Sequence, residues 1–309
     1  MKNIYRGCLF LILLCFFLLP YVASDYYIAL FFNVLMWIAL TVSWVILSGY
    51  SGYISLAHSA FFGLGAYFMA LTWSYLPYLL IIFLAGVLSG GFALAIGLPF
   101  LKVRGPYFVI LTLGLTEFVK FIFVNLEIKL GGTVGRVLIQ TPSLISLYYC
   151  LLIVSLASIV TAIWIKRSKF GVALLSIKED EDTANSVGIN TTLYKLLAFG
   201  ISSFTPGMVG AILALRHSYI DPYTVFSPII SFQVIVMAFL GGVEKVHSAI
   251  LGVVMLTFLS EALWVRYPHA YLIILGVIVI IVVKFMPLGM LHYVEVILKR
   301  KIHEFFTSS

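Results

Sequence analysis

The sequence predicts an all-α, polytopic integral membrane protein with about nine to ten transmembrane or half-spanning helices. Three observations support this fold class. Hydrophobic residues make up 62% of the 309 residues and charged residues only 10%, whereas a soluble domain carries roughly 25% charged residues. Several apolar runs are long enough for a helix to cross a hydrocarbon core of about 30 Å. The alternating pattern of β-barrel strands is absent from the sequence.

Each helix is predicted from an apolar run of roughly 20 residues, because backbone polar groups in lipid must be paired within the segment. The runs predict helices at about 8–23, 28–48, 55–73, 78–99, 107–126, 147–165, 195–216, 246–264 and 270–286. A tenth stretch, 229–241, is short and ends at Gly241 and Gly242, which predicts a half-helix or a re-entrant turn. Pro206 and Pro222 are expected at or beside helix ends.

The first 24 residues allow two interpretations. Lys2 and Arg6 precede an apolar run and a small-residue stretch ending at Ser24, as in a cleaved signal peptide. The alternative is an uncleaved first helix, and this alternative agrees better with the distribution of positive charge.

Lysine and arginine in short loops are retained on the cytoplasmic side of a membrane. Ten crossings from a cytoplasmic N-terminus place fourteen of the nineteen lysine and arginine residues on the cytoplasmic side. This topology also places both termini in the cytoplasm. The fourteen are Lys2, Arg6, Lys102, Arg104, Lys166, Arg167, Lys169, Lys178, Lys195, Lys245, Lys284, Lys299, Arg300 and Lys301. The net charge of +7 is therefore interpreted as a topology signal, and no nucleic-acid partner is expected.

The longest polar segment, residues 166–194, is expected to be a cytoplasmic loop because lysine and arginine mark its start. Its apolar spacing predicts two short amphipathic helices. The acidic run Glu179 to Asp182 should begin the second, where a helix N-terminus favours carboxylates, and Gly188 should end it. The segment is either a hydrated turn without a partner or a docking site for a cytoplasmic protein.

Motifs for catalysis are absent from the sequence, which contains no GxxxxGK[ST], HExxH or GxSxG pattern. The three cysteines, Cys8, Cys15 and Cys150, lie in apolar runs without metal-ligand spacing. We therefore expect neither a catalytic nor a metal site, no cofactor bound by this chain, and no ATP hydrolysis by it.

The polar segment 166–194 resembles the coupling loop of ABC-transporter permeases. It is still more similar to the pattern REDExAAxxxGIN of branched-chain amino acid permeases. The matching residues are Glu179, Asp180, Glu181, Ala184, Gly188, Ile189 and Asn190. Blocks at 48–71, 101–122, 197–215 and 239–256 are similar to the same family in order and spacing. The chain is thus identified as a member of the LivM-type permeases over about residues 28–286. Ala57 departs from the family, which usually has glycine before the histidine at this point.

The resemblance implies that residues 1–309 form a single permease domain of an ATP-binding-cassette importer in the bacterial inner membrane, with 166–194 as its coupling loop. It implies two cytoplasmic ATPase subunits that use ATP, a second related permease, an extracytoplasmic binding protein and contact with membrane lipid. Glu179, Asp180, Glu181, Ala184 and Gly188 would couple to the ATPase. Branched-chain amino acids are the expected substrates. The alternatives are a permease for urea or short amides, and an ion- or proton-coupled secondary transporter.

Ionisable residues inside apolar runs cost free energy when they lie in lipid, so each of them needs a partner or a function. Glu117 and Lys120, at i and i+3, are expected to form a structural ion pair, with a substrate contact as the alternative. Glu261 either reaches the membrane surface or faces a cavity. His58 is either a proton relay or a hydrogen-bonded packing residue.

The pathway is expected where helices are broken, because free backbone groups there can bind an amino acid zwitterion. The two candidate breaks are the glycine-rich stretch at 55–65 and the turn at 241–242. The predicted lining residues are Ser55, His58, Gly241 and Gly242, with Phe61 and Phe62 as part of the apolar wall.

Overall fold

The computed structural model describes residues 15–267 apart from 132, 133 and 140, together with 273, 274, 276, 277 and 280. Within these residues, seven helical segments are long and apolar enough to cross a membrane. They are Asp25–Gly49, Tyr78–Phe100, Pro106–Lys129, Leu144–Arg167, Thr191–His217, Pro222–Gly241 and Val246–Arg266. The expected total of nine to ten is not confirmed. Of the predicted range 8–23, residues 15–22 are helical, and most of 270–286 lies outside the described residues.

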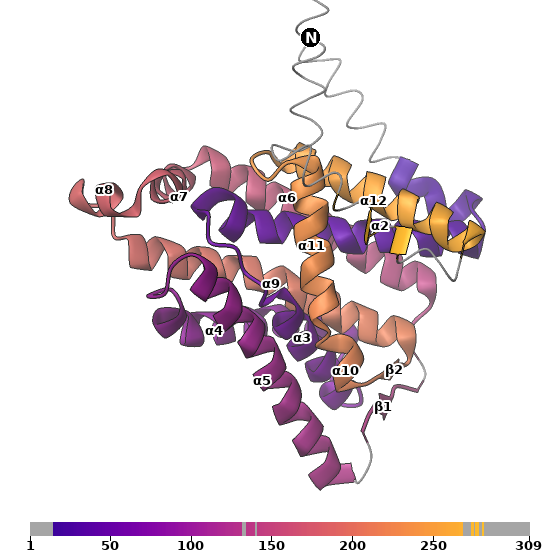
Figure 1. The fold of residues 1–309 in the computed structure, drawn as a ribbon. Coiled ribbons are helices and arrows are strands. Elements are labelled where there is room, and N and C mark those ends of the chain that lie inside the picture. The colour runs from indigo at the N-terminus through magenta and orange to yellow at the C-terminus, as the bar shows by residue number, and fades with distance from the viewer. Residues whose placement is uncertain are drawn as a thin grey trace, which may run out of the picture.

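The elements follow one another as helices, with one small two-stranded sheet (Figure 1). The helices are α2 (Asp25–Trp44), the π-helix η1 (Val45–Gly49), α3 (His58–Thr72), α4 (Tyr78–Phe100), α5 (Pro106–Gly131), α6 (Leu144–Arg167), α7 (Lys169–Glu179), α8 (Glu181–Ser186), α9 (Thr191–His217), α10 (Pro222–Val225), α11 (Pro228–Gly241) and α12 (Val246–Arg266). The strands β1 (Arg136–Val137) and β2 (Tyr219–Ile220) pair antiparallel. Helices α7 and α8 lie at the opposite end of the molecule from this sheet.

Helix α9 occupies the centre of the bundle and packs against α3, α4, α2 and α6. Small residues allow the close approach. A Cβ added to Gly65 would lie 1.9 Å from the carbonyl oxygen of Gly207, and one added to Gly210 would lie 1.9 Å from that of Phe62. These glycines therefore serve helix packing, because small residues let helix backbones approach closely in a membrane.

Two sequence-based expectations about helix boundaries are wrong. Helix α3 begins at His58 and not at residue 55, because residues 52–57 are non-helical. Pro206 lies inside the continuous helix α9, although we expected it near a helix end. Its ring removes one helix hydrogen bond, but packing on several sides holds α9 in a single helix. Pro222 is the first residue of α10, as expected for a helix start.

Candidate docking segment and broken-helix site

Residues 166–194 contain the two short helices predicted from the sequence, α7 and α8. Asp180 caps α8, because its side chain accepts a hydrogen bond from the Thr183 N–H at 2.8 Å. Gly188 ends the segment with φ of +91°, a backbone conformation that favours glycine. Asn190 then caps α9 by accepting from the Leu193 N–H at 3.1 Å. The sequence pattern therefore specified this local structure correctly.

The docking segment α7–α8 presents both charged and apolar side chains at one end of the molecule (Figure 1). Glu179 and Asp180 are exposed, whereas Ala184 is buried. Val172 and Val187 are 61% and 72% exposed. The segment therefore has a mixed surface of exposed carboxylates and exposed valines.

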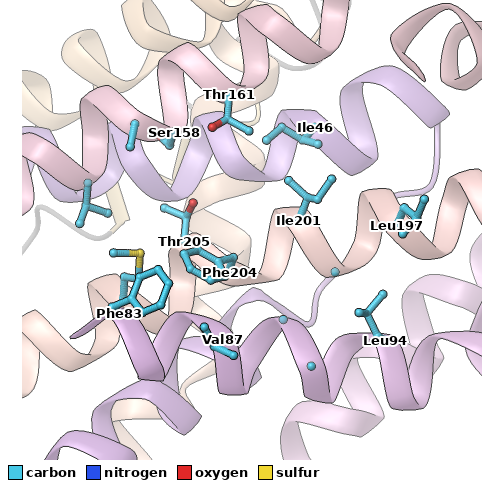
Figure 2. A pocket seen from close by; sticks show the side chains of 16 residues that line it. Ile46, Phe83, Val87, Leu94, Ser158, Thr161, Leu197, Ile201, Phe204 and Thr205 are labelled. Carbon is cyan, nitrogen blue, oxygen red and sulfur yellow. The ribbon is translucent and has the colours of Figure 1, made fainter. Parts of the chain in front are cut away.

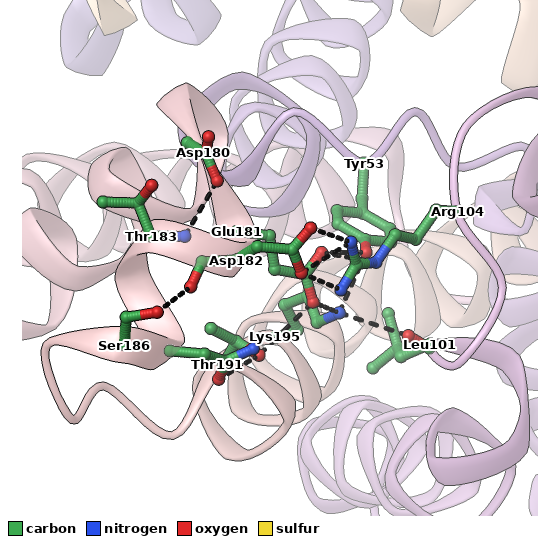
Figure 3. Close-up of polar contacts among 11 residues, drawn as sticks. Tyr53, Leu101, Arg104, Asp180, Glu181, Asp182, Thr183, Ser186, Thr191 and Lys195 are labelled. Atoms are coloured by element: carbon green, nitrogen blue, oxygen red, sulfur yellow. Dashed lines mark hydrogen bonds and ion pairs between the residues drawn. The ribbon is translucent and has the colours of Figure 1, made fainter.

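Glu181 turns inward, unlike its acidic neighbours, and joins a polar cluster (Figure 3). The Lys195 ammonium, at the start of α9, donates to Glu181 Oε1 at 2.5 Å and to the Leu101 carbonyl at 3.2 Å. The Tyr53 hydroxyl donates to Glu181 Oε2 at 2.5 Å and accepts from Lys195 at 2.9 Å. Arg104 Nε lies 3.3 Å from the same Oε2. We call Glu181, Lys195, Tyr53 and Arg104 the Glu181 cluster.

Burial makes the Glu181 cluster energetically important. The Lys195 side chain is 2% exposed and that of Glu181 is 10% exposed. Burial by itself would raise the pKa of Glu181, but the hydrogen bonds from Lys195 and Tyr53 outweigh it, and the pKa is lowered from its ordinary value. The carboxylate therefore remains ionised, and the cluster ties α8 to α9 and to the segment before α3.

Arg104, which follows α4, also binds the solvent-exposed side of α8. Its guanidinium donates three hydrogen bonds of 3.1 to 3.3 Å to the carboxylate of Asp182. The Asp182 side chain is 81% exposed, so this pair contributes roughly 1 kcal/mol or less to stability. Thr191 donates to Glu181 Oε1 at 3.3 Å and to Asn185 Oδ1 at 3.1 Å.

Residues 52–57, the broken segment, return into the bundle without helical structure. Side chains from three helices pair with its backbone groups. The Trp44 indole donates to the Ser55 carbonyl at 2.9 Å, and the Leu56 N–H donates to the Thr112 hydroxyl at 3.0 Å. The Ser231 hydroxyl donates to the Leu56 carbonyl at 2.8 Å. These bonds allow irregular backbone to lie inside an apolar bundle.

The pathway residues predicted near this break are buried in the structure. Ser55, His58, Phe61 and Phe62 are each at most 1% exposed. His58 Nε2 lies 3.4 Å from the Ser43 hydroxyl, while Nδ1 has no hydrogen-bond partner in the part of the chain that the structure describes. The structure thus brings these four residues together around the start of α3.

The second predicted break lies at the turn between α11 and α12. Gly241 ends α11, and a Cβ there would lie 1.9 Å from the Ser248 carbonyl oxygen. Gly242 has φ of +118° and is non-helical. This turn is separate from the broken segment, although Ser231 of α11 contacts the latter through Leu56.

One cavity, of about 550 Å³, is lined by the predicted wall residue Phe62 together with Met36, Gly210 and Ile230. Two further cavities flank these elements. One of about 630 Å³ lies between α4, α6 and α9, and Figure 2 shows Phe83, Val87, Ile201 and Phe204 pointing into it. Its lining is almost entirely apolar and includes none of the predicted pathway residues. Another, of about 540 Å³, is lined by Tyr53, Ile54, Arg104, Ile110 and Glu181. This last cavity therefore connects the Glu181 cluster with α5.

Sequence reasoning missed the roles of Tyr53, Arg104 and Lys195. In the sequence, Lys195 and Arg104 indicate only the membrane topology, and Tyr53 is one of 18 tyrosines. A single signal was available, since a lysine within the predicted apolar helix 195–216 requires a partner. The identity of that partner depends on contacts between distant parts of the chain.

Comparisons with known proteins agree with the resemblance found in the sequence. Residues 26–283 match the family described as branched-chain amino acid transport system / permease component. The chain is 27% identical over 306 residues to the high-affinity branched-chain amino acid transport system permease protein LivM of Salmonella typhimurium, covering 86% of this chain and 70% of that protein. LivM of Escherichia coli is 26% identical over 306 residues, which again cover 86% of this chain and 70% of that protein. A probable permease protein LivH of Methanocaldococcus jannaschii is 28% identical over 161 residues, covering 52% of this chain and 47% of that protein. No solved structure matches the chain.

Proposed function

Because this chain belongs to the family of permease components of branched-chain amino acid transport systems, we propose that it lines the translocation pathway of an ATP-binding-cassette importer for leucine, isoleucine and valine. The chain itself is not an enzyme, and ATP is used by two cytoplasmic ATPase subunits. A second, related permease completes the pathway, and an extracytoplasmic binding protein delivers the substrate. The protein lies in the bacterial inner membrane with both termini in the cytoplasm. The names of the LivM relatives, which are permease proteins of branched-chain amino acid transport systems, support the proposed transport function and substrate class.

The observation that carries the proposal is the connection between the docking segment and the broken segment. Exposed Val172 and Val187 offer α7–α8 to a partner, while Glu181 joins the same segment to Tyr53. Tyr53 belongs to the broken segment, three residues before Leu56. Movement of a docked ATPase would therefore be transmitted to the backbone at the start of α3. This is rigid-body coupling of the kind that produces alternating access.

The broken segment also supports the proposed substrate class. An amino acid zwitterion needs polar partners inside an apolar bundle, whereas an aliphatic side chain needs only apolar walls. The hydroxyls of Ser55, Thr112 and Ser231 and the backbone at Leu56 supply polar groups. Phe61 and Phe62 supply apolar surface. Both kinds of group are close to the start of α3 and become available if the segment moves.

Gly188 provides the direct test of docking. We expect Gly188→Trp to abolish ATP-dependent uptake and to reduce co-purification of the ATPase. The reason is steric, because the indole would fill space that the docked ATPase needs. Gly188→Ala is the matched control. It carries the same unfavourable positive φ but adds little bulk, and nothing within 4 Å would contact its Cβ.

The measurement is uptake of labelled leucine into proteoliposomes that contain the complete transporter, with and without a protonophore. Uptake that requires ATP and persists with the protonophore supports an importer driven by ATPases. Uptake that requires a proton gradient and no ATP would contradict the proposal. Equal ATPase recovery from wild type and Gly188→Trp would contradict the assignment of the docking surface.

A further inference from the structure

Helix α5 has an outward face that no other described element covers. Ile110 and Phe118 are 66% and 63% exposed, and Phe121 is 58% exposed. Gly114 lies on the same face, and a Cβ placed there would meet nothing within 4 Å. Figure 1 shows α5 running obliquely along one side of the molecule, away from α6 and α12.

A charged pair lies halfway along this helix. Lys120 Nζ is 2.5 Å from Glu117 Oε2, which confirms the ion pair expected from the sequence. Both residues are roughly 15 Å from the nearer end of the span Pro106–Lys129, given a rise of about 1.5 Å per residue. Side-chain exposures of 38% for Glu117 and 14% for Lys120 place the pair at the edge of the outward face.

The described residues leave much of the pair's hydrogen-bonding capacity unused. A lysine ammonium has three donors and a carboxylate accepts up to about four hydrogen bonds. Within the part of the chain that the structure describes, the ammonium contacts Glu117 and lies 6.0 Å from the centre of the Phe121 ring, and the Glu117 carboxylate contacts only Lys120. Charged groups at mid-membrane depth otherwise face protein or water and avoid lipid tails. The face that bears Glu117 therefore requires a polar neighbour.

Two other partly exposed helices, α4 and α6, provide the contrast. Helix α4 contains no Asp, Glu, Lys or Arg, and α6 contains such residues only at Lys166 and Arg167, its last two positions. Their exposed faces carry large apolar side chains such as Phe83 and Ile153. The exposed faces of α4 and α6 therefore fit contact with lipid, whereas the α5 face carries a charged group at mid-membrane depth.

We propose that the α5 face, defined by Ile110, Gly114, Glu117, Phe118 and Phe121, is the surface that packs against the second permease subunit. This inference rests on the proposed function, which supplies a second permease. Gly114 admits a neighbouring helix at close range, as small residues do in membranes. A polar or charged group of the second subunit at the same level would supply the partner that the Glu117 carboxylate lacks.

The position of α5 along the molecule agrees with this assignment. Its first turns, at Val109 and Ile110, line the cavity that also contains Tyr53 and Glu181. The proposed interface therefore begins beside the broken segment and the docking segment. Movement of the docking segment would alter the contact between the two permeases at the same time as it alters the start of α3.

Photo-cross-linking tests which helix faces the second subunit. A photoreactive benzoylphenylalanine is placed at Phe118 on α5 and, as the matched control, at Phe83 on α4, which is 53% exposed. The complete transporter is irradiated in native membranes with different tags on its two permeases. We expect a cross-linked permease pair from position 118 and at least tenfold less from position 83.

A pair of glycine variants tests the same surface by steric exclusion. Gly114→Trp and Gly91→Trp both add bulk to a helix at a position where a Cβ meets nothing within 4 Å. Both chains should therefore insert and remain folded. We expect Gly114→Trp to lower co-purification of the second permease at least tenfold, while Gly91→Trp leaves it unchanged.

Wild-type uptake is measured in the same membranes, which separates the two proposals. Absence of ATP-dependent uptake by the wild type would contradict the proposed function. Normal uptake together with equal cross-linking from positions 118 and 83, or with full recovery of the second permease by Gly114→Trp, would overturn the interface alone.

Discussion

Glu181 is the residue on which the candidate docking site depends most. Its carboxylate accepts hydrogen bonds from Lys195 and Tyr53, and the chain segments that carry these two residues are far apart in sequence. Asp182, the next residue, differs because its side chain is exposed and bonded only to the exposed Arg104 and its own helix. Two adjacent carboxylates therefore have different consequences when they are neutralised.

We expect Glu181→Gln to destabilise the protein by about 3 kcal/mol, because Lys195 would remain buried without its counter-charge. Asp182→Asn is the control and should change the free energy of unfolding by roughly 1 kcal/mol or less. The measurement is thermal unfolding of both variants in the same detergent. Equal transition temperatures for the two variants would mean that the Glu181–Lys195 contact contributes little.

The pH dependence of stability should report on the same carboxylate. The pKa of Glu181 is lowered in the folded protein, while an unperturbed glutamate has a pKa of about 4.3. Its contribution is therefore complete above the unfolded pKa and is lost as pH falls through the lowered folded pKa. We expect the wild type to lose more stability than Glu181→Gln between about pH 6 and pH 3. Parallel curves would contradict the assignment.

At the scale of elements, contact between α3 and α9 depends on glycines that approach a neighbouring backbone. Gly210 faces the Phe62 carbonyl and Gly65 faces that of Gly207. Backbone cannot move aside as a flexible side chain does, so the helices must separate if a side chain is added. The same contact places Phe62 and the other residues at the start of α3.

We expect Gly210→Ala to destabilise the protein by about 1 to 3 kcal/mol through overpacking, despite the better helix propensity of alanine. Gly91→Ala in α4 is the matched control, because its Cβ meets nothing within 4 Å, and it should be neutral or slightly stabilising. Unfolding temperatures in detergent provide the measurement. A neutral Gly210→Ala would show that α3 and α9 can move apart freely.

At the scale of the whole molecule, the described conformation buries most of the residues predicted to line the pathway. The six predicted lining residues are buried or half-buried. In the broken segment beside them, Gly52 is exposed and Ile54 is half-buried, and both line a cavity. If these residues line the pathway, transport requires the segment before α3 to move relative to α5 and α11, whose hydroxyls pair with its backbone.

We expect a cysteine at Ser55 to react with a small water-soluble thiol reagent several-fold faster in one nucleotide state of the transporter than in the other. The background replaces Cys8, Cys15 and Cys150 with serine. Tyr75→Cys serves as the control, because Tyr75 is 83% exposed in the loop after α3. If cysteines at all six predicted positions are protected in both states while Tyr75→Cys is labelled, the pathway lies elsewhere.

Several features of this protein are determined by the sequence alone. Low charge and long apolar runs require membrane-spanning helices, since lipid cannot pair with backbone groups. The two short helices α7 and α8 follow from local side-chain chemistry, with Asp180 at the start of α8 and Gly188 after its end. The Glu117–Lys120 pair also follows from the sequence, because one helical turn brings positions i and i+3 together.

Only the tertiary structure decided where α3 begins and what Glu181 binds. Residues 55–57 are as apolar as the helix that follows them, so composition could not distinguish helix from irregular backbone. The choice depends on Trp44, Thr112 and Ser231, whose side chains pair with the freed backbone groups from distant helices. The partners of Glu181 lie 128 and 14 residues away in sequence. Such contacts arise from the packing of the bundle, and sequence patterns with periods of a few residues carry no information about them.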